Sequence, residues 1–250
     1  MGVLNVTPDS FSDGGRFLDP ERAVAHGLAL VAEGADVVDV GGESTRPGAA
    51  PVGEAEERRR VIPVVEALAP SVRVSIDTRS VAVAEAAVAV GATLVNDVSA
   101  SLSAVAARAG VGWVAMHMQG SPATMQADPR YDDVVAEVAA FLRDRVERAR
   151  EAGVEEVWVD PGIGFGKTLE HNLQLLRDLD QLAAGGIPVV VGTSRKRSLG
   201  RLTGDAPVDD RLEASVATAV WAADHGAAMV RVHDVAPTVQ ALALLAGAAA

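Results

Sequence analysis

The sequence predicts an α/β protein, a (β/α)8 TIM barrel that forms a single domain over residues 1–250. Eight short apolar runs alternate with Ala-rich segments of helical character, which is the order of a repeated strand–helix unit. The runs are continuous in Val, Ile and Leu, as in parallel strands whose outer faces are covered by helices. An open doubly wound sheet is the alternative, and it would place its site at a switch point rather than around a ring.

The predicted strands end on polar residues, and barrel enzymes place their chemistry at the carboxyl ends of their strands. In chain order these residues are Asn5, Asp39, Asp77, Asn96 with Asp97, His117, Asp160, Ser194, and Arg231 with His233. The pattern therefore predicts the location of the site as well as the fold.

Helical segments are predicted between the strands. Asp19 followed by a proline marks the start of the first, because a capping Asp and a first-turn Pro are typical of helix N-termini. The predicted helices cover residues 19–33, 55–68, 81–90, 103–109, 132–152, 169–182, 211–225 and 236–245. Several end at a glycine, which adopts the left-handed conformation past a helix end at little cost. These glycines are Gly34, Gly91, Gly110, Gly153 and Gly226.

The composition limits the classes of function. A formal net charge of −12 argues against nonspecific binding to nucleic acid or membranes, but not against a small anionic substrate. The chain has no cysteine, which excludes disulfides and thiolate metal sites. It shows no signal peptide and no apolar stretch of membrane-spanning length, so we expect a cytoplasmic protein with small-molecule partners.

Three loops after predicted strands, at residues 7–18, 41–53 and 118–130, are longer than usual for βα connections and are expected to be functional. The Gly-rich stretch at 160–168 is not a phosphate-binding P-loop, because Gly162 and Gly166 enclose three residues where that motif needs four. There remains Asp160 at a strand end, followed by glycines that let the backbone approach a flat or charged ligand. A Gly-rich turn with a capping Asp is the alternative.

Three consecutive cations, Arg195 to Arg197, begin a helix after the seventh strand. Cations are unfavourable at a helix N-terminus, which predicts a compensating anion or polar ligand there, unless the turn is simply solvated. Arg231 and His233 alternate along the eighth strand and are expected to point to the same side. Barrels often bind phosphate near these two strands.

Asp77, Asn96 and Asp160 provide carboxylates and an amide that suit a heterocycle with an amino-pyrimidine edge. The same residues suit hydrogen bonds at the barrel mouth or metal ligands, and their spacing does not separate these alternatives. No role is assigned to His117.

Taken together, the motifs resemble the dihydropteroate synthases almost from end to end. They are NVTPDSFSDGG at 5–15, DVGGESTRPG at 39–48, SIDT at 75–78, ND at 96–97, MHMQG at 116–120, DPGIGFGK at 160–167, SRK at 194–196 and RVHD at 231–234. The resemblance implies the barrel fold, a homodimer, and the condensation of 6-hydroxymethyl-7,8-dihydropterin diphosphate with p-aminobenzoate. Its products are 7,8-dihydropteroate and pyrophosphate, in folate biosynthesis.

The resemblance also implies roles for individual residues. Those expected to hold the pterin are Asp77, Asn96, Asp160 and Lys196. Asn5 is expected to bind the cofactor Mg²⁺. Those expected to hold the diphosphate are Arg46, Arg231 and His233. Those expected to form the p-aminobenzoate pocket are Phe11, Thr45, Pro47 and Ser194. The Asp9 and Asp13 carboxylates of the first loop are expected to stabilise the pterin cation or to contact the metal indirectly, and Asp9 is a predicted catalytic residue together with Asp77, Asp160 and Lys196.

This chemistry requires no protein nucleophile. Loss of pyrophosphate leaves a cation delocalised into the pterin, which the arylamine attacks, while metal and cationic side chains stabilise the leaving group. Two other functions remain open. One is a pterin-binding barrel that transfers a methyl group from methyltetrahydrofolate to a corrinoid protein, and the other is a paralogue that binds pterin without condensing it.

Overall fold

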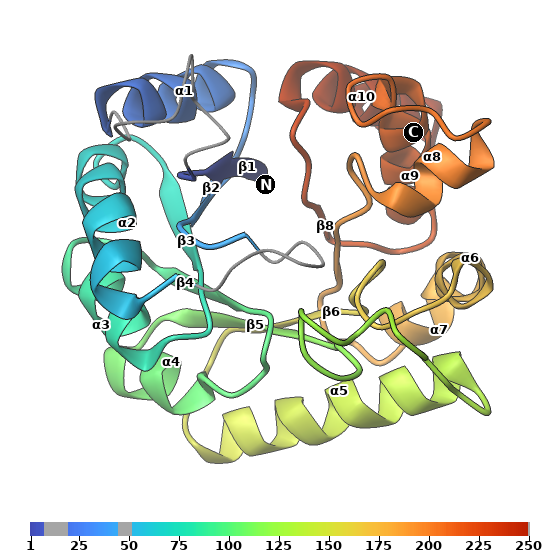
Figure 1. Ribbon diagram of the computed structural model, residues 1–250, viewed down its shortest axis with the longest axis horizontal. Helices are drawn as coiled ribbons and strands as arrows, with labels where there is room; N and C mark the ends of the chain where they lie inside the picture. Colours follow the sequence, from blue (N-terminus) through green and yellow to red (C-terminus); the bar gives the residue numbers. More distant parts are fainter. Residues whose placement is uncertain (8–19, 45–51, 250) are drawn as a thin grey trace.

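A computed structural model describes residues 1–7, 20–44 and 52–249, and it confirms a closed barrel. Figure 1 shows the strands in the middle of the molecule with the helices arranged around them. The strands are β1 (Gly2–Asn5), β2 (Val37–Gly41), β3 (Arg73–Asp77), β4 (Leu94–Asp97), β5 (Gly112–Met116), β6 (Val157–Asp160), β7 (Val190–Val191) and β8 (Met229–Val230). All strand pairs are parallel, as the continuous apolar runs predict.

The barrel closes through two single bridges. β1 to β6 form one sheet in chain order, and β7 pairs with β8 in a second sheet. Parallel bridges Val159↔Val189 and Gly2↔Val232 join the two sheets at either side. The open doubly wound alternative is therefore wrong, because the last strand returns to the first.

The helices confirm the predicted order with one correction. They are α1 (Pro20–Ala32), α2 (Glu54–Leu68), α3 (Val81–Ala89), α4 (Ser103–Ala109), α5 (Val134–Glu151), α6 (Leu169–Arg177), α7 (Leu179–Ala183), α8 (Arg197–Leu202), α9 (Leu212–Asp224) and α10 (Val235–Ala249). The single helix expected at 169–182 is interrupted at Asp178, whose φ of −103° and ψ of 25° leave the helical range. Leu179 and Leu182 of α7 are buried, and their spacing continues that of Leu175 and Leu176 in α6. The five predicted glycine caps all have positive φ.

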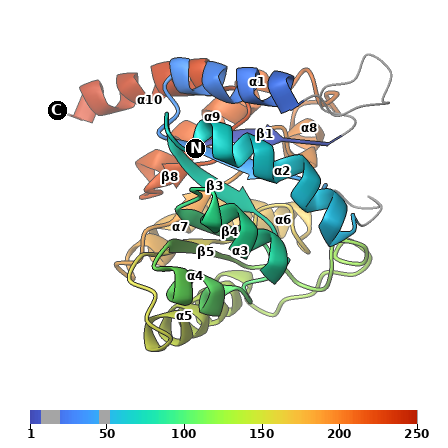
Figure 2. The same ribbon diagram turned by 90° about the vertical axis from the view of Figure 1, so that its left-hand side faces the viewer.

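Figure 2 shows helices on the outside of the strands. They pack on the strands through a large cluster of buried Val, Leu and Ala side chains. A separate, smaller apolar cluster fills the barrel interior. It consists of Met1, Val37, Leu94, Val114 and Val190, with Trp158 and Met229 against it. In the described part of the chain, no helix is both long enough and apolar enough to cross a bilayer.

The barrel interior changes from apolar to polar along the strands. In β2, side chains on one face follow the order Val37, Asp39, Gly41, and the register places Asp39 beside Ser75 and Gly41 beside Asp77 on β3. Asp39 and Ser75 are both fully buried. The polar layer therefore lies toward the carboxyl ends of the strands, where the sequence predicts the site.

Candidate active site

Arg231 connects three strands at the carboxyl end of the barrel. Its Nε donates to Oδ2 of Asp39 at 2.6 Å, and its Nη2 donates to Oδ2 of Asp77 at 2.7 Å. The Asn96 amide also donates to Oδ2 of Asp39, at 3.0 Å. The expected cost of burying an arginine beside β8 is thus offset by two carboxylates. Asp39, to which the sequence assigned no task, holds both Arg231 and Asn96 in place.

Burial favours the neutral forms of Asp77, Asp160 and Lys196. It raises the pKa of Asp77 to about 7 against the opposing charge of Arg231. It lowers the pKa of Lys196 to about 8, and Arg231 acts in the same direction while Asp160 and Asp77 oppose it. Burial also raises the pKa of Asp160, opposed first by the backbone N–H of Gly162. Such shifts in convergent groups are typical of functional sites.

Lys196 and Asp160 face the site next to a Gly-rich loop. Nζ of Lys196 lies 4.0 Å from the centroid of the Phe165 ring, in cation–π contact. Oδ1 of Asp160 accepts from the backbone N–H of Gly162 at 2.6 Å. A Cβ on Gly164 would lie only 3.3 Å from the Lys196 side chain, so the backbone of this loop passes close to Lys196. The spacing of the motifs did not predict Phe165 as a site residue. The signal that could have identified it is its position within a run of glycines directly after a strand.

Ser194 and His233 form a pair beside Arg231. Oγ of Ser194 accepts from the His233 backbone N–H at 3.1 Å and lies 3.0 Å from its Nδ1. Between Ser194 and Lys196, Arg195 adopts a φ of 59°, in the left-handed region. An ion pair with Asp234, whose Oδ2 accepts from Arg195 Nε at 3.0 Å, holds this turn. The sequence placed Arg231 and His233 within strand eight, but β8 ends at Val230 and both residues lie just beyond it.

We expect His233 to make stability depend on pH. Burial, followed by the charges of Arg231 and Arg195, lowers the pKa of His233 to about 3. Between pH 6.5 and 3 the unfolded chain then binds a proton that the folded site excludes, so this contribution to stability is lost as the pH falls. The loss is at most about 1.4 kcal/mol per pH unit. The free energy of unfolding, measured with urea at pH 7 and pH 5, should fall less between these pH values in the His233→Gln variant than in the parent. An equal effect of pH on both proteins would contradict the assignment.

Asn96 and Asp97, neighbours in β4, have different tasks. Asn96 faces the site, whereas Asp97 is fully buried outside it. The Asp97 carboxylate accepts from the backbone N–H groups of Ser99, Ser101 and Leu102 and from the indole of Trp113. Asp97 therefore shapes the β4–α4 loop and has no direct place in the site.

Asn5 offers an amide oxygen beside Asp77. Oδ2 of Asp77 and Oδ1 of Asn5 would lie 3.6 and 3.8 Å from a Cβ added to Gly41, so both oxygens flank this glycine. No cluster of three or more His, Asp or Glu suited to a metal is found among the described residues. Mg²⁺ commonly takes only one or two protein oxygens, with water and substrate phosphates completing its shell. The oxygen donors here fit that requirement.

Several predicted site residues lie outside the described part of the chain. They are Asp9, Phe11, Asp13, Thr45, Arg46 and Pro47.

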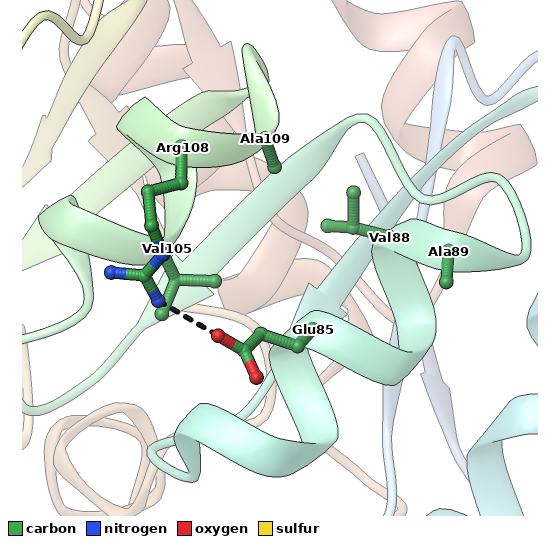
Figure 3. A pocket seen from close by; sticks show the side chains of 6 residues that line it. All are labelled: Glu85, Val88, Ala89, Val105, Arg108 and Ala109. Carbon is green, nitrogen blue, oxygen red and sulfur yellow. Dashed lines mark hydrogen bonds and ion pairs between the residues drawn. The ribbon is translucent and has the colours of Figure 1, made fainter.

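A cavity on the outer surface is not a competing site. It has a volume of about 220 Å³ and lies between α3 and α4, with Glu85 and Arg108 paired at 2.7 Å across it (Figure 3). Its other lining residues are Val88, Ala89, Val105 and Ala109. All belong to the helical layer, and none of the strand-end residues contributes.

Comparisons with known proteins agree with this geometry. Residues 1–233 match the family described as pterin binding enzyme. The chain is 51% identical to the dihydropteroate synthase of Mycobacterium leprae, over 97% of this chain and 90% of that protein. It is 48% identical to the Escherichia coli dihydropteroate synthase, over 97% and 88%.

Solved structures give the same result. The Xanthomonas albilineans dihydropteroate synthase with 4-aminobenzoic acid is similar with a TM-score of 0.93 and 49% identity, covering 100% of this chain and 92% of that one. A structure of the synthase from that organism in complex with 7,8-dihydropteroate has a TM-score of 0.90 and 46% identity, with the same coverage.

Proposed function

The chain belongs to the dihydropteroate synthases, within the pterin-binding enzymes, and from this membership we propose how its residues carry out the reaction. The enzyme condenses 6-hydroxymethyl-7,8-dihydropterin diphosphate with p-aminobenzoate and releases pyrophosphate, in folate biosynthesis. The observation that carries the proposed roles is the convergence of Asp77, Asn96, Asp160, Lys196 and Arg231 at one end of the barrel.

Asp160, Asn96 and Lys196 hold the pterin ring in this proposal. Oδ1 of Asp160 is already bonded to Gly162, so Oδ2 is the acceptor for the 2-amino group and the ring N–H. Lys196 donates to the ring edge from its position over Phe165. Asp77, which is paired with Arg231, completes the pocket between Asn96 and Asn5.

The diphosphate lies at the cationic side of the same mouth. Arg231 uses Nε and Nη2 for Asp39 and Asp77, which leaves Nη1 for a phosphate oxygen. His233 is next to it, and Arg46 is proposed to join them. Mg²⁺ held by Asn5 would neutralise charge on the pyrophosphate when bound.

The condensation then needs no covalent intermediate with the protein. The C–O bond to the diphosphate breaks with both electrons going to oxygen, and the methylene carbon becomes a cation delocalised into the pterin. The p-aminobenzoate nitrogen forms the new bond with its lone pair and loses a proton to solvent. Cationic groups around the leaving oxygen favour this separation of charge, because they are already in place before it develops. Phe11, Thr45, Pro47 and Ser194 hold the arylamine, with Asp9 beside the cation.

Pyrophosphate release tests the activity. Purified protein with the pterin diphosphate, p-aminobenzoate and Mg²⁺ is expected to release pyrophosphate in equal amount to dihydropteroate. Omission of p-aminobenzoate is the control for hydrolysis. Binding of the pterin diphosphate without product would instead indicate the non-catalytic paralogue.

Removing the Asn5 side chain tests the metal assignment. The Asn5→Ala variant is expected to need about tenfold more Mg²⁺ for half-maximal pyrophosphate release, because the ion loses one of the few protein oxygens that would hold it. The KM for p-aminobenzoate should stay within about twofold. An unchanged Mg²⁺ titration curve would exclude Asn5 as a ligand.

The homodimer and the cytoplasmic compartment are part of the same proposal. Exposed apolar side chains at α9 support the first, with Leu212 39% and Trp221 46% exposed. Sedimentation of the parent and of the Leu212→Glu variant tests it. A parent that sediments as a monomer at micromolar concentration would contradict the dimer.

A further inference from the structure

Lysine is rare in this chain. Of 22 Lys and Arg residues, only Lys167 and Lys196 are lysines. Lys196 faces the pterin pocket, whereas Lys167 is 2% exposed, just before α6. The reaction as described gives Lys167 no task, and His117, which contacts it, also has none.

The Lys167 ammonium is surrounded by acceptors from two loops. Nζ lies 2.9 Å from Nδ1 of His117 and 3.3 Å from its carbonyl oxygen. It also lies 3.0 Å from each of the carbonyl oxygens of Gly162 and Phe165. None of these four acceptors is a carboxylate. Burial lowers the pKa of Lys167 to about 7, and the charge of Asp160 opposes this shift. This arrangement of acceptors suits the three rotatable donors of an ammonium and not the planar fork of a guanidinium. It therefore explains a lysine here in a chain whose Lys and Arg positions, apart from 167 and 196, are all arginine.

His117 is suited to accept this bond. Burial, followed by the charge of Lys167, lowers the pKa of His117 to about 3, so its imidazole is neutral. In the tautomer protonated at Nε2, Nδ1 accepts from the Lys167 Nζ that lies 2.9 Å away. Its ring is fixed edge-on against Phe141, with centroids 4.9 Å apart. The anchor is therefore part of the rigid core beneath α5.

The two loops are also in direct backbone contact. A Cβ on Gly162 would overlap with the His117 carbonyl, and a Cβ on Gly166 would overlap with that of Gln119. Both glycines have positive φ, of 68° and 62°. The loop at 162–166 carries the Gly162 N–H that binds Asp160 and the Phe165 ring that lies under Lys196. We call the contacts that hold this loop against His117 and Gln119 the clamp. A shift of this loop would therefore displace both pterin-binding groups.

We propose that Lys167 is a positioning residue, which binds the Gly162 and Phe165 carbonyls to His117 and thereby fixes Asp160, Phe165 and Lys196 for the pterin. The inference rests on the proposed function, because it assigns a support to the same pterin pocket. It gives His117 a task as the anchor of this support, without contact to substrate. Among the described residues proposed for the other two ligands, Arg231, His233 and Ser194 make no hydrogen bond to Lys167, so we expect those ligands to be affected less than the pterin.

The test compares substrates in one variant. Lys167→Met keeps the length of the side chain and removes its donors. Calorimetric binding of the pterin diphosphate, without p-aminobenzoate, is expected to weaken by about tenfold or more, because Asp160 and Lys196 lose the geometry in which they hydrogen-bond the ring. Affinity for pyrophosphate alone and the KM for p-aminobenzoate should change by less than about twofold. Equal loss for all three ligands, or no loss for the pterin, would overturn the proposal.

A second pair of variants keeps the test decisive if Lys167→Met does not fold. His117→Asn retains an acceptor near the position of Nδ1, whereas His117→Leu does not. We expect the first to bind the pterin diphosphate within about threefold of the parent and the second to lose about tenfold. Similar behaviour of both variants would contradict the clamp. Failure of the parent to bind this substrate would contradict the proposed function instead, so the two failures are distinguishable.

Discussion

Replacing Arg231 by methionine is expected to lower the free energy of unfolding by about 3–5 kcal/mol, because the buried carboxylates of Asp39 and Asp77 lose their counter-ion. Asp39 is fully buried and its Oδ2 depends on Arg231 and Asn96. Its Oδ1 has no hydrogen-bond partner among the described residues. The measurement is urea unfolding at pH 7, followed through tryptophan fluorescence.

Two further variants identify the cause of that loss. Arg201→Met removes an exposed arginine from α8 and should change stability by less than about 0.5 kcal/mol. Combining Arg231→Met with Asp39→Asn removes one of the stranded charges, so the double variant should recover part of the loss. If the losses of unfolding free energy caused by Arg231→Met and by Asp39→Asn simply added in the double variant, the unpaired charges would not be the source of the instability.

Turnover is expected to fall on the order of a hundredfold or more in the Asp160→Asn variant, with the fold retained. The Asn side chain still presents Oδ1 to the Gly162 N–H, which is bonded at 2.6 Å in the parent. Its NH2 group, however, faces the pterin donors that the carboxylate oxygen accepts. Two donors then meet without an acceptor, and an unsatisfied polar group in a buried site is costly. Lys196→Met is also expected to lower turnover, because it removes the Nζ donor to the pterin ring edge.

Steady-state kinetics and thermal unfolding separate this effect from general damage. The matched control is Asp180→Asn on α7, where the aspartate is exposed and distant in sequence from the strand ends. It should keep parental kcat/KM and melting temperature. An Asp160→Asn enzyme with parental kcat/KM would remove Asp160 from the site.

Helix and strand positions were predictable because they depend on local chemistry. Glycine caps and apolar runs carry their conformation in a few neighbouring residues, and all five caps adopt the expected left-handed φ. The error at Asp178 has the same origin. The apolar spacing of a helix continues through this position, from Leu175 and Leu176 to Leu179 and Leu182, so the pattern contains no sign of the break.

The sequence by itself determined the barrel, the ring of polar strand ends and, through resemblance, the reaction. Only the tertiary structure decided which of these groups are partners. Arg231 and Asp39 are separated by 192 residues, and their pairing follows from the closure of β8 onto β1. Likewise, Lys167 and His117 are 50 residues apart, and neither has a recognisable motif that links it to the other. Strand ends are marked by the period of the chain, whereas contacts across the barrel depend on register and closure, which no local pattern contains.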